Sequence, residues 1–233
     1  MISNIKHLSV LAATVLLASC GNQAASQPGS KANAPSSLAS TTNESSNNLA
    51  LLAAAEEFET LTESSFSANS AAREMMISKA SVASAKIVKF ASSKLATQIK
   101  SHLANIQNAQ KQNATADLAI ESNEAFRTLV SAVGGKQAIP VNVSLLDYAG
   151  FRVDADAQAT PARFADMKVA VLFAQEQWAG IKSRQEIAKL AARFSTSLDH
   201  MDLAARSGDV AKARAAAKVE LDMVDELETA FSH

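Results

Sequence analysis

Cys20 carries the only thiol in this 233-residue chain and is therefore its one site for sulfur chemistry. It follows an apolar run over residues 8–17, and Lys6 stands just before that run. A basic start, a short apolar stretch and small residues before a cut are typical of a cleavable secretory signal. The run is too short to span a bilayer, which needs roughly 20 apolar residues. Residues 1–19 are therefore predicted to be a signal peptide.

Leu17-Ala18-Ser19-Cys20 resembles the lipobox of bacterial lipoproteins. In that class the signal is cut before the cysteine and lipid is attached to its sulfur. The resemblance implies a mature chain that begins at a lipid-anchored Cys20, with its domain facing the periplasm or the cell surface. In that class an aspartate after the cysteine favours retention in the inner membrane. Gly21 follows Cys20 here, which implies the outer membrane. A mature chain with Cys20 acylated is expected to form no disulfide and to offer no cysteine nucleophile.

The other residues with catalytic or ligating side chains match no established site pattern. Di-iron bundles use Glu-x-x-His, which places both ligands on one helix face, but neither His102 nor His200 has Glu three residues before it. Motifs for c-type haem, zinc proteases, serine hydrolases and nucleotide-binding loops are absent from the sequence. The carboxylates at 56–59 and 222–226 are interpreted as solvated helix faces. We therefore expect no enzymatic activity, no metal and no cofactor.

His102 and His200 leave one alternative open. A helical bundle can hold haem through one His and one Met, as in cytochrome b562-like proteins. A ligand-, haem- or metal-carrying bundle of the periplasm is thus the second functional hypothesis. It is the weaker hypothesis, because the last helix of those proteins carries the histidine ligand and residues 222–229 contain none.

Composition favours a soluble helical protein over a nucleic-acid binder. The 22 basic and 23 acidic residues give a formal net charge of −1, with no long run of either sign, so nucleic acid is not an expected partner. Only 7 Gly and 4 Pro occur, and alanine is frequent, which favours helices over strands.

A shift in composition near Leu49 predicts two regions in the mature chain. Residues 20–48 comprise Cys20 and a Ser/Asn/Ala-rich stretch with two prolines, which is predicted to be a disordered tether. Residues 49–233 are predicted to form one all-α domain, an antiparallel up-and-down helical bundle, because apolar residues recur every three or four positions. Helices are expected over about 49–63, 67–80, 82–108, 116–133, 160–180, 183–206 and 209–231.

Residues 136–159 do not show the helical period and are predicted to be an irregular connection. Leu145, Leu146, Tyr148 and Phe151 are bulky for a free loop. They either fold back over the open end of the bundle or contact a partner, for which an envelope protein or cell-wall material is expected. The first functional hypothesis is therefore a non-enzymatic interaction or scaffold module, held at the outer membrane by its lipid.

Residues 86–91, Lys-Ile-Val-Lys-Phe-Ala, resemble residues 186–191, Glu-Ile-Ala-Lys-Leu-Ala. Chance similarity between Ala-rich helices and an internal duplication both remain possible. A duplication would relate two helical hairpins by a pseudo-twofold axis. That pattern is faintly similar to a ferritin-like family of duplicated helical envelope proteins of unknown function. The chain has Thr97-Gln98 where that family has an Asp-His pair, so the resemblance implies no functional residue here.

Overall fold

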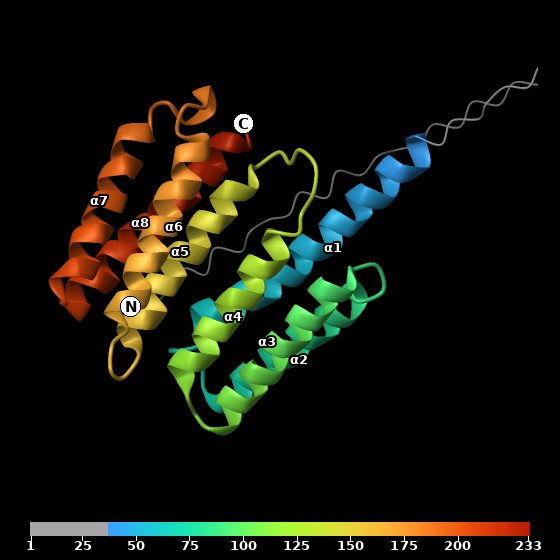
Figure 1. Ribbon diagram of the computed structural model, residues 1–233, viewed down its shortest axis with the longest axis horizontal. Helices are drawn as coiled ribbons and strands as arrows, with labels where there is room; N and C mark the ends of the chain where they lie inside the picture. Colours follow the sequence, from blue (N-terminus) through green and yellow to red (C-terminus); the bar gives the residue numbers. More distant parts are fainter. Residues whose placement is uncertain (1–36) are drawn as a thin grey trace, which may run out of the picture. The chain divides into compact units, whose positions relative to one another are not determined.

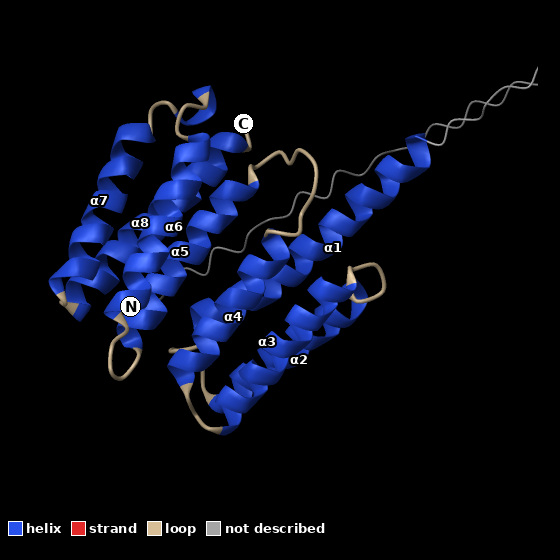
Figure 2. Cartoon of the chain, viewed as in Figure 1, coloured by secondary structure: helices blue, strands red, loops and turns tan. Residues whose placement is uncertain are grey.

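The computed structural model describes residues 37–233, with side chains from Glu44 onward. The predicted signal peptide, Cys20 and the tether up to residue 36 lie outside these residues. All regular structure in the described part is helical, which confirms the predicted all-α class (Figure 2). None of the helices within this part is both long and apolar enough to cross a membrane.

The helices alternate with short connections along the chain. Their bounds are α1 (Ser37–Ser64), α2 (Ser70–Ile87), α3 (Ser93–Lys111), α4 (Thr115–Val130), α5 (Val141–Gln158), α6 (Phe164–Ile181), the short 3₁₀-helix η1 (Gln185–Ile187), α7 (Ala191–Ser207) and α8 (Val210–Phe231).

The predicted antiparallel bundle is confirmed and is built as two consecutive four-helix bundles (Figure 1). In the first, each of α1 to α4 packs on the next helix and α4 returns to α1. In the second, α5 to α8 repeat the same order, and α8 returns to α5. The bundles join where α4 packs against α5. Buried apolar side chains from both bundles form one continuous core.

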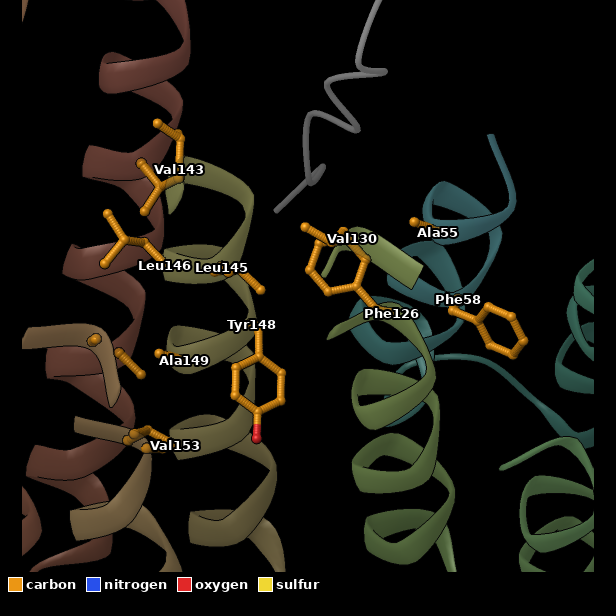
Figure 3. Close-up of a cluster of buried hydrophobic side chains, with 14 of the residues drawn as sticks. Ala55, Phe58, Phe126, Val130, Val143, Leu145, Leu146, Tyr148, Ala149 and Val153 are labelled. Carbon is orange, nitrogen blue, oxygen red and sulfur yellow. The ribbon is translucent and has the colours of Figure 1, made fainter. Parts of the chain in front are cut away.

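Residues 141–158 form helix α5, so the prediction of an irregular connection was wrong. This helix packs against α4, α6 and α8. In Figure 3, Leu145 and Tyr148 lie on the side that faces α4, whereas Val143 and Leu146 lie on the other side. A helix buried on several sides carries apolar residues around most of its circumference. The one-sided period by which the other helices were found is therefore missing from its sequence.

Helix α1 begins at Ser37, earlier than the predicted domain boundary at Leu49. Asn48 is only 9% exposed, and its side-chain amide makes two hydrogen bonds with the backbone of Gly134. The Asn48 Nδ2 donates to the Gly134 carbonyl at 2.8 Å, and the Gly134 N–H donates to Asn48 Oδ1 at 3.1 Å. Specific hydrogen bonds thus fix polar residues that the composition assigned to the tether.

The helix predicted over 82–108 is in fact two helices. Helix α2 ends at Ile87, and Ser92 caps α3 by accepting a hydrogen bond from the Leu95 N–H at 3.2 Å. The two similar segments, 86–91 and 186–191, occupy equivalent places, between the second and third helices of their bundles. Ile87 and Ile187 are both buried there, at 1% and 0% exposure. The two similar segments therefore lie near the same link of the repeated helix order.

Candidate functional site at the bundle junction

Polar side chains of helix α5 lie in two different environments. This helix contacts α4 of the first bundle on one side and α6 and α8 of the second bundle on the others. Tyr148, Arg152 and Asp156 interact with charged side chains of α4 and of α5 itself. Asp147, the neighbour of Tyr148, interacts instead with carboxylates of α1 and α8. These two surroundings differ in their charge balance.

The paired junction consists of Glu124 and Arg127 of α4 and Tyr148, Arg152 and Asp156 of α5. Arg152 bridges the Glu124 and Asp156 carboxylates, with its Nε 2.8 Å from Asp156 Oδ2. Arg127 binds the second oxygen of Glu124 at 2.6 Å, and the Tyr148 hydroxyl donates to Glu124 at 2.7 Å. The Arg127 guanidinium also lies 5.0 Å from the centre of the Tyr148 ring, in cation–π geometry. Two carboxylates thus meet two guanidinium groups.

Burial makes this network dependent on its arginines. Asp156 has no exposed surface, and burial raises its pKa to about 6 even though Arg152 acts to lower it. Removing one partner from a buried ion pair costs about 3–5 kcal/mol, because the other charge stays buried without compensation. The paired junction is therefore a structural element that holds α4 and α5 together.

The acidic junction consists of Glu59 of α1, Asp147 of α5, and Asp225 and Glu228 of α8. The carboxylates of Glu59, Glu228 and Asp225 all lie near enough to Asp147 to repel its negative charge. Glu59 is subject to the same repulsion from Glu228 and Asp225. Asp147 is 8% exposed, Glu59 and Glu228 are half-buried, and Asp225 is exposed. Residues far apart in the sequence therefore place like charges together.

These four carboxylates have no positive partner within the described residues: no side-chain hydrogen bond or ion pair engages them. Burial, followed by the charge of Glu228, raises the pKa of Glu59 to about 8. Burial, followed by Asp225, raises the pKa of Glu228 to about 7. Burial and then Glu59 hold the pKa of Asp147 well above its usual range. All of these effects favour the protonated, neutral form.

Glu220 of α8 adds a fifth acid, which lies at the contact between α5 and α8. It is fully buried, and neither of its carboxyl oxygens has a hydrogen-bond partner in the described part of the chain. Burial raises its pKa well above the usual value. It packs against Gly150, where an added Cβ would collide with Glu220 Oε2 and lie 2.7 Å from Leu221 Cγ. Glycine at this position lets the two helices approach closely.

The acidic junction has the chemistry of a cation acceptor. Nowhere in the described chain do three His, Cys, Asp or Glu side chains converge closely enough to hold a metal ion. The carboxylates are instead distributed over three helices. Such an arrangement can take up protons, or it can bind separate positive groups of an extended ligand through charge-assisted hydrogen bonds.

The two histidines singled out from the sequence lie outside both junctions. His102 links α3 to α4: its Nδ1 is 3.0 Å from Glu121 Oε2 and its Nε2 is 3.4 Å from Thr128 Oγ1. Both ring nitrogens are thus engaged by neighbouring side chains. His200 is exposed on α7. This geometry offers no support for haem ligation by His102.

The four predicted partner-contact residues lie in α5 rather than in a surface loop. Leu145, Leu146 and Tyr148 are 8%, 0% and 6% exposed and belong to the core, and Phe151 is half-buried. The prediction that these three side chains are accessible anchors was wrong, because packing on α4, α6 and α8 covers them. The sequence analysis did not single out Asp147, which lies between Leu146 and Tyr148.

The interpretation of all the carboxylates at 56–59 as a solvated face also needs correction at Glu59. Its partners on α5 and α8 lie more than 80 residues away in the sequence. One signal was present: α1 has five glutamates and no basic residue. Another was Glu220, which stands three residues after Ala217 and four before Val224, on the apolar stripe of α8.

Comparison with known proteins gives no relative from which a site could be transferred: no protein-family model, curated protein or solved structure matches the chain. The functional assignment therefore rests on the residues themselves.

Proposed function

We propose that this chain is a non-enzymatic binding module of the bacterial envelope, held at the outer membrane by lipid on Cys20, whose binding site is the acidic junction. The observation that carries the binding function is the set of unpaired carboxylates at Glu59, Asp147 and Glu228. Buried charges in folded proteins are normally paired, and unpaired ones reduce stability. A positively charged partner would supply the missing compensation.

The membrane part of the proposal is supported by the sequence Leu17-Ala18-Ser19-Cys20 and by Gly21. More than one acyl chain makes membrane attachment stable, since each buried methylene contributes about 0.8 kcal/mol. Membrane fractions from cells expressing Cys20→Ala should lose the protein to the soluble fraction. An unchanged membrane share in that variant contradicts lipid anchoring.

The proposed binding function is tested by identifying the molecules that co-purify with the native protein. The mature protein is purified from membranes in non-ionic detergent at low salt, and bound protein and small molecules are identified by mass spectrometry. We expect cationic material that is released at low pH, because protonation of the carboxylates removes the charge that binds a cation. The same material should be missing from Glu59→Gln/Glu228→Gln.

A matched control has the same change of charge on the same two helices. Glu57→Gln/Asp222→Asn also neutralises one acid on α1 and one on α8, but neither residue belongs to the acidic junction, and Asp222 is exposed and paired with Lys218. The control should retain the bound material. Identical recovery from both double variants contradicts a binding site at the acidic junction.

A further inference from the structure

We propose that the acidic junction binds a linear polyamine, a small flexible chain with two or more ammonium groups, an inference that rests on the proposed binding function. The starting observation is Asp147. Its side chain is only 8% exposed, lies among the carboxylates of α1 and α8, and has no hydrogen bond or ion pair with any described residue. When such an acid ionises, a cation beside it offsets the cost of burying its charge.

The distribution of charge favours several separated positive groups over one metal ion. On α1, Glu56, Glu59 and Glu63 recur on one face and span about 10 Å at 1.5 Å per residue. After burial and the charge of Glu228, the charges of Glu63 and Glu56 both help to raise the pKa of Glu59. On α8, Asp225 and Glu228 are three residues apart and face the same region. A chain with spaced ammonium groups matches this pattern, whereas a single ion would need ligands that converge.

The depth of Asp147 favours ammonium over guanidinium as the binding group. An ammonium group is compact, has three donors and sits at the end of a narrow methylene chain. Guanidinium is planar and broader, and Asp147 is only 8% exposed. A free polyamine is also smaller than a folded basic partner, so the observations favour a small molecule.

Protonation provides a linked signature of binding. The groups that face Asp147 and Glu59 are all acids: Glu56 and Glu63 on α1, and Glu220, Asp225 and Glu228 on α8. The pKa of Glu59 is about 8 and that of Glu228 is about 7, so both hold protons part of the time at pH 7. An ammonium group favours the charged carboxylate and expels these protons. Binding should therefore release protons and strengthen as pH rises from 6 to 8.

The experiment is a calorimetric titration of spermidine into the purified mature chain at pH 7.5, repeated in two buffers of different ionisation enthalpy. We expect one molecule bound per chain, a buffer-dependent heat that shows proton release, and an affinity that rises by up to about tenfold per pH unit for each linked proton. Glu59→Gln/Glu228→Gln should weaken binding at least tenfold. Glu57→Gln/Asp222→Asn should bind as the native chain does.

Competing ligands separate the alternatives. Magnesium, calcium, a monoamine and tetralysine are titrated under the same conditions, with added NaCl as the ionic-strength control. Tighter binding of a divalent ion, or of tetralysine, overturns the polyamine assignment in favour of a metal or a basic protein segment. Spermidine binding no stronger than the monoamine, or unaffected by Glu59→Gln/Glu228→Gln, also overturns it. Circular dichroism confirms that the variants are folded, which we expect because glutamine resembles the protonated acid.

Failure of this inference differs from failure of the proposed function. If spermidine does not bind but other cationic material still requires Glu59 and Glu228 in the capture experiment, the site stands and its ligand class is wrong. If the same material is captured by the native chain and by Glu59→Gln/Glu228→Gln, the proposed binding function itself is wrong.

Discussion

The paired junction and the acidic junction both include residues of helix α5, but only the carboxylates of the paired junction have arginine partners. At the paired junction, Arg152 and Arg127 neutralise Glu124 and Asp156 across the contact between the bundles. At the acidic junction, carboxylates from three helices approach one another, and no described basic side chain compensates Asp147. The first arrangement joins two bundles. The second leaves a deficit of positive charge that only protons or a bound cation can fill.

The difference teaches that burial of acids in this protein has two purposes. A buried acid with an arginine partner specifies how helices meet. A buried acid without one weakens the fold at high pH, and the cation that we propose for the acidic junction would offset this cost. Each prediction below sets one junction against the other.

The largest effect is expected from Arg152→Met. The substitution leaves Glu124 and the fully buried Asp156 without their shared cation, so we expect a loss of about 3–5 kcal/mol in the free energy of unfolding. Urea unfolding measures it. Arg206→Met is the control, because Arg206 is exposed and its ion pair is with Asp202, one turn before it on the surface of α7, so its midpoint should change little. Equal midpoints for both variants would mean that the paired junction does not hold the bundles together.

The next effect concerns the close contact of α5 with α8 beside the acidic junction. Gly150→Ala places a Cβ against Glu220 Oε2 and 2.7 Å from Leu221 Cγ, and such overpacking costs about 1–3 kcal/mol. Gly180→Ala is the matched control in helix α6, where the added Cβ meets only the end of the Asn142 side chain at 3.2 Å. The control should be neutral or stabilising, since alanine favours helix by about 1 kcal/mol. Thermal unfolding of both variants distinguishes the two contacts.

The acidic junction should make the native protein less stable as pH rises. The folded-state pKa of Glu59, about 8, and that of Glu228, about 7, exceed the ordinary value of 4.5, so the native state binds more protons than the unfolded state between pH 4.5 and 8. Stability from these groups is full below pH 4.5 and is lost through that range. We expect Tm to fall by at least about 5 °C between pH 5 and 8.5, because each pKa unit corresponds to about 1.4 kcal/mol and each kcal/mol to roughly 2–4 °C.

Glu59→Gln/Glu228→Gln should flatten this pH profile, because glutamine does not titrate. Glu57→Gln/Asp222→Asn should keep the native slope. A double variant at the acidic junction that retains the full fall in Tm would show that other groups cause it.

The smallest effect separates a single hydrogen bond at the paired junction from the surrounding charges. Tyr148→Phe removes the hydroxyl that donates to Glu124 at 2.7 Å, while Arg127 and Arg152 still bind that carboxylate. We expect a loss of about 1 kcal/mol. A much larger loss would assign to Tyr148 the role that we assign to the arginines.

Amphipathic helices and the bundle class could be predicted from the sequence because each helix with one buried face repeats its apolar residues every three or four positions. Helix α5 escaped this test because its neighbours cover it on several sides, and apolar residues surround Asp147 and Tyr148. The buried position of Asn48 could not be predicted, because hydrogen bonds to Gly134 rather than an apolar side chain hold it there.

The acidic junction could not be predicted because its members come from α1, α5 and α8, and only the fold brings them together. Single residues gave partial signals. Asp147 stands between Leu146 and Tyr148, and Glu220 lies on the apolar stripe of α8. A charged residue on a buried face is a better pointer to a site than an exposed acid such as Asp222, which pairs with Lys218.

The most direct measurement is an NMR titration of the side-chain carboxyl carbons of Glu59, Asp147 and Glu228 in the mature chain. We expect midpoints near pH 8 for Glu59 and near pH 7 for Glu228, and a midpoint well above the ordinary 3.8 for Asp147. All three midpoints should move down when spermidine is added. Midpoints near pH 4 for all three groups, unchanged by spermidine, would contradict both the unpaired state of the acidic junction and its role as a cation site.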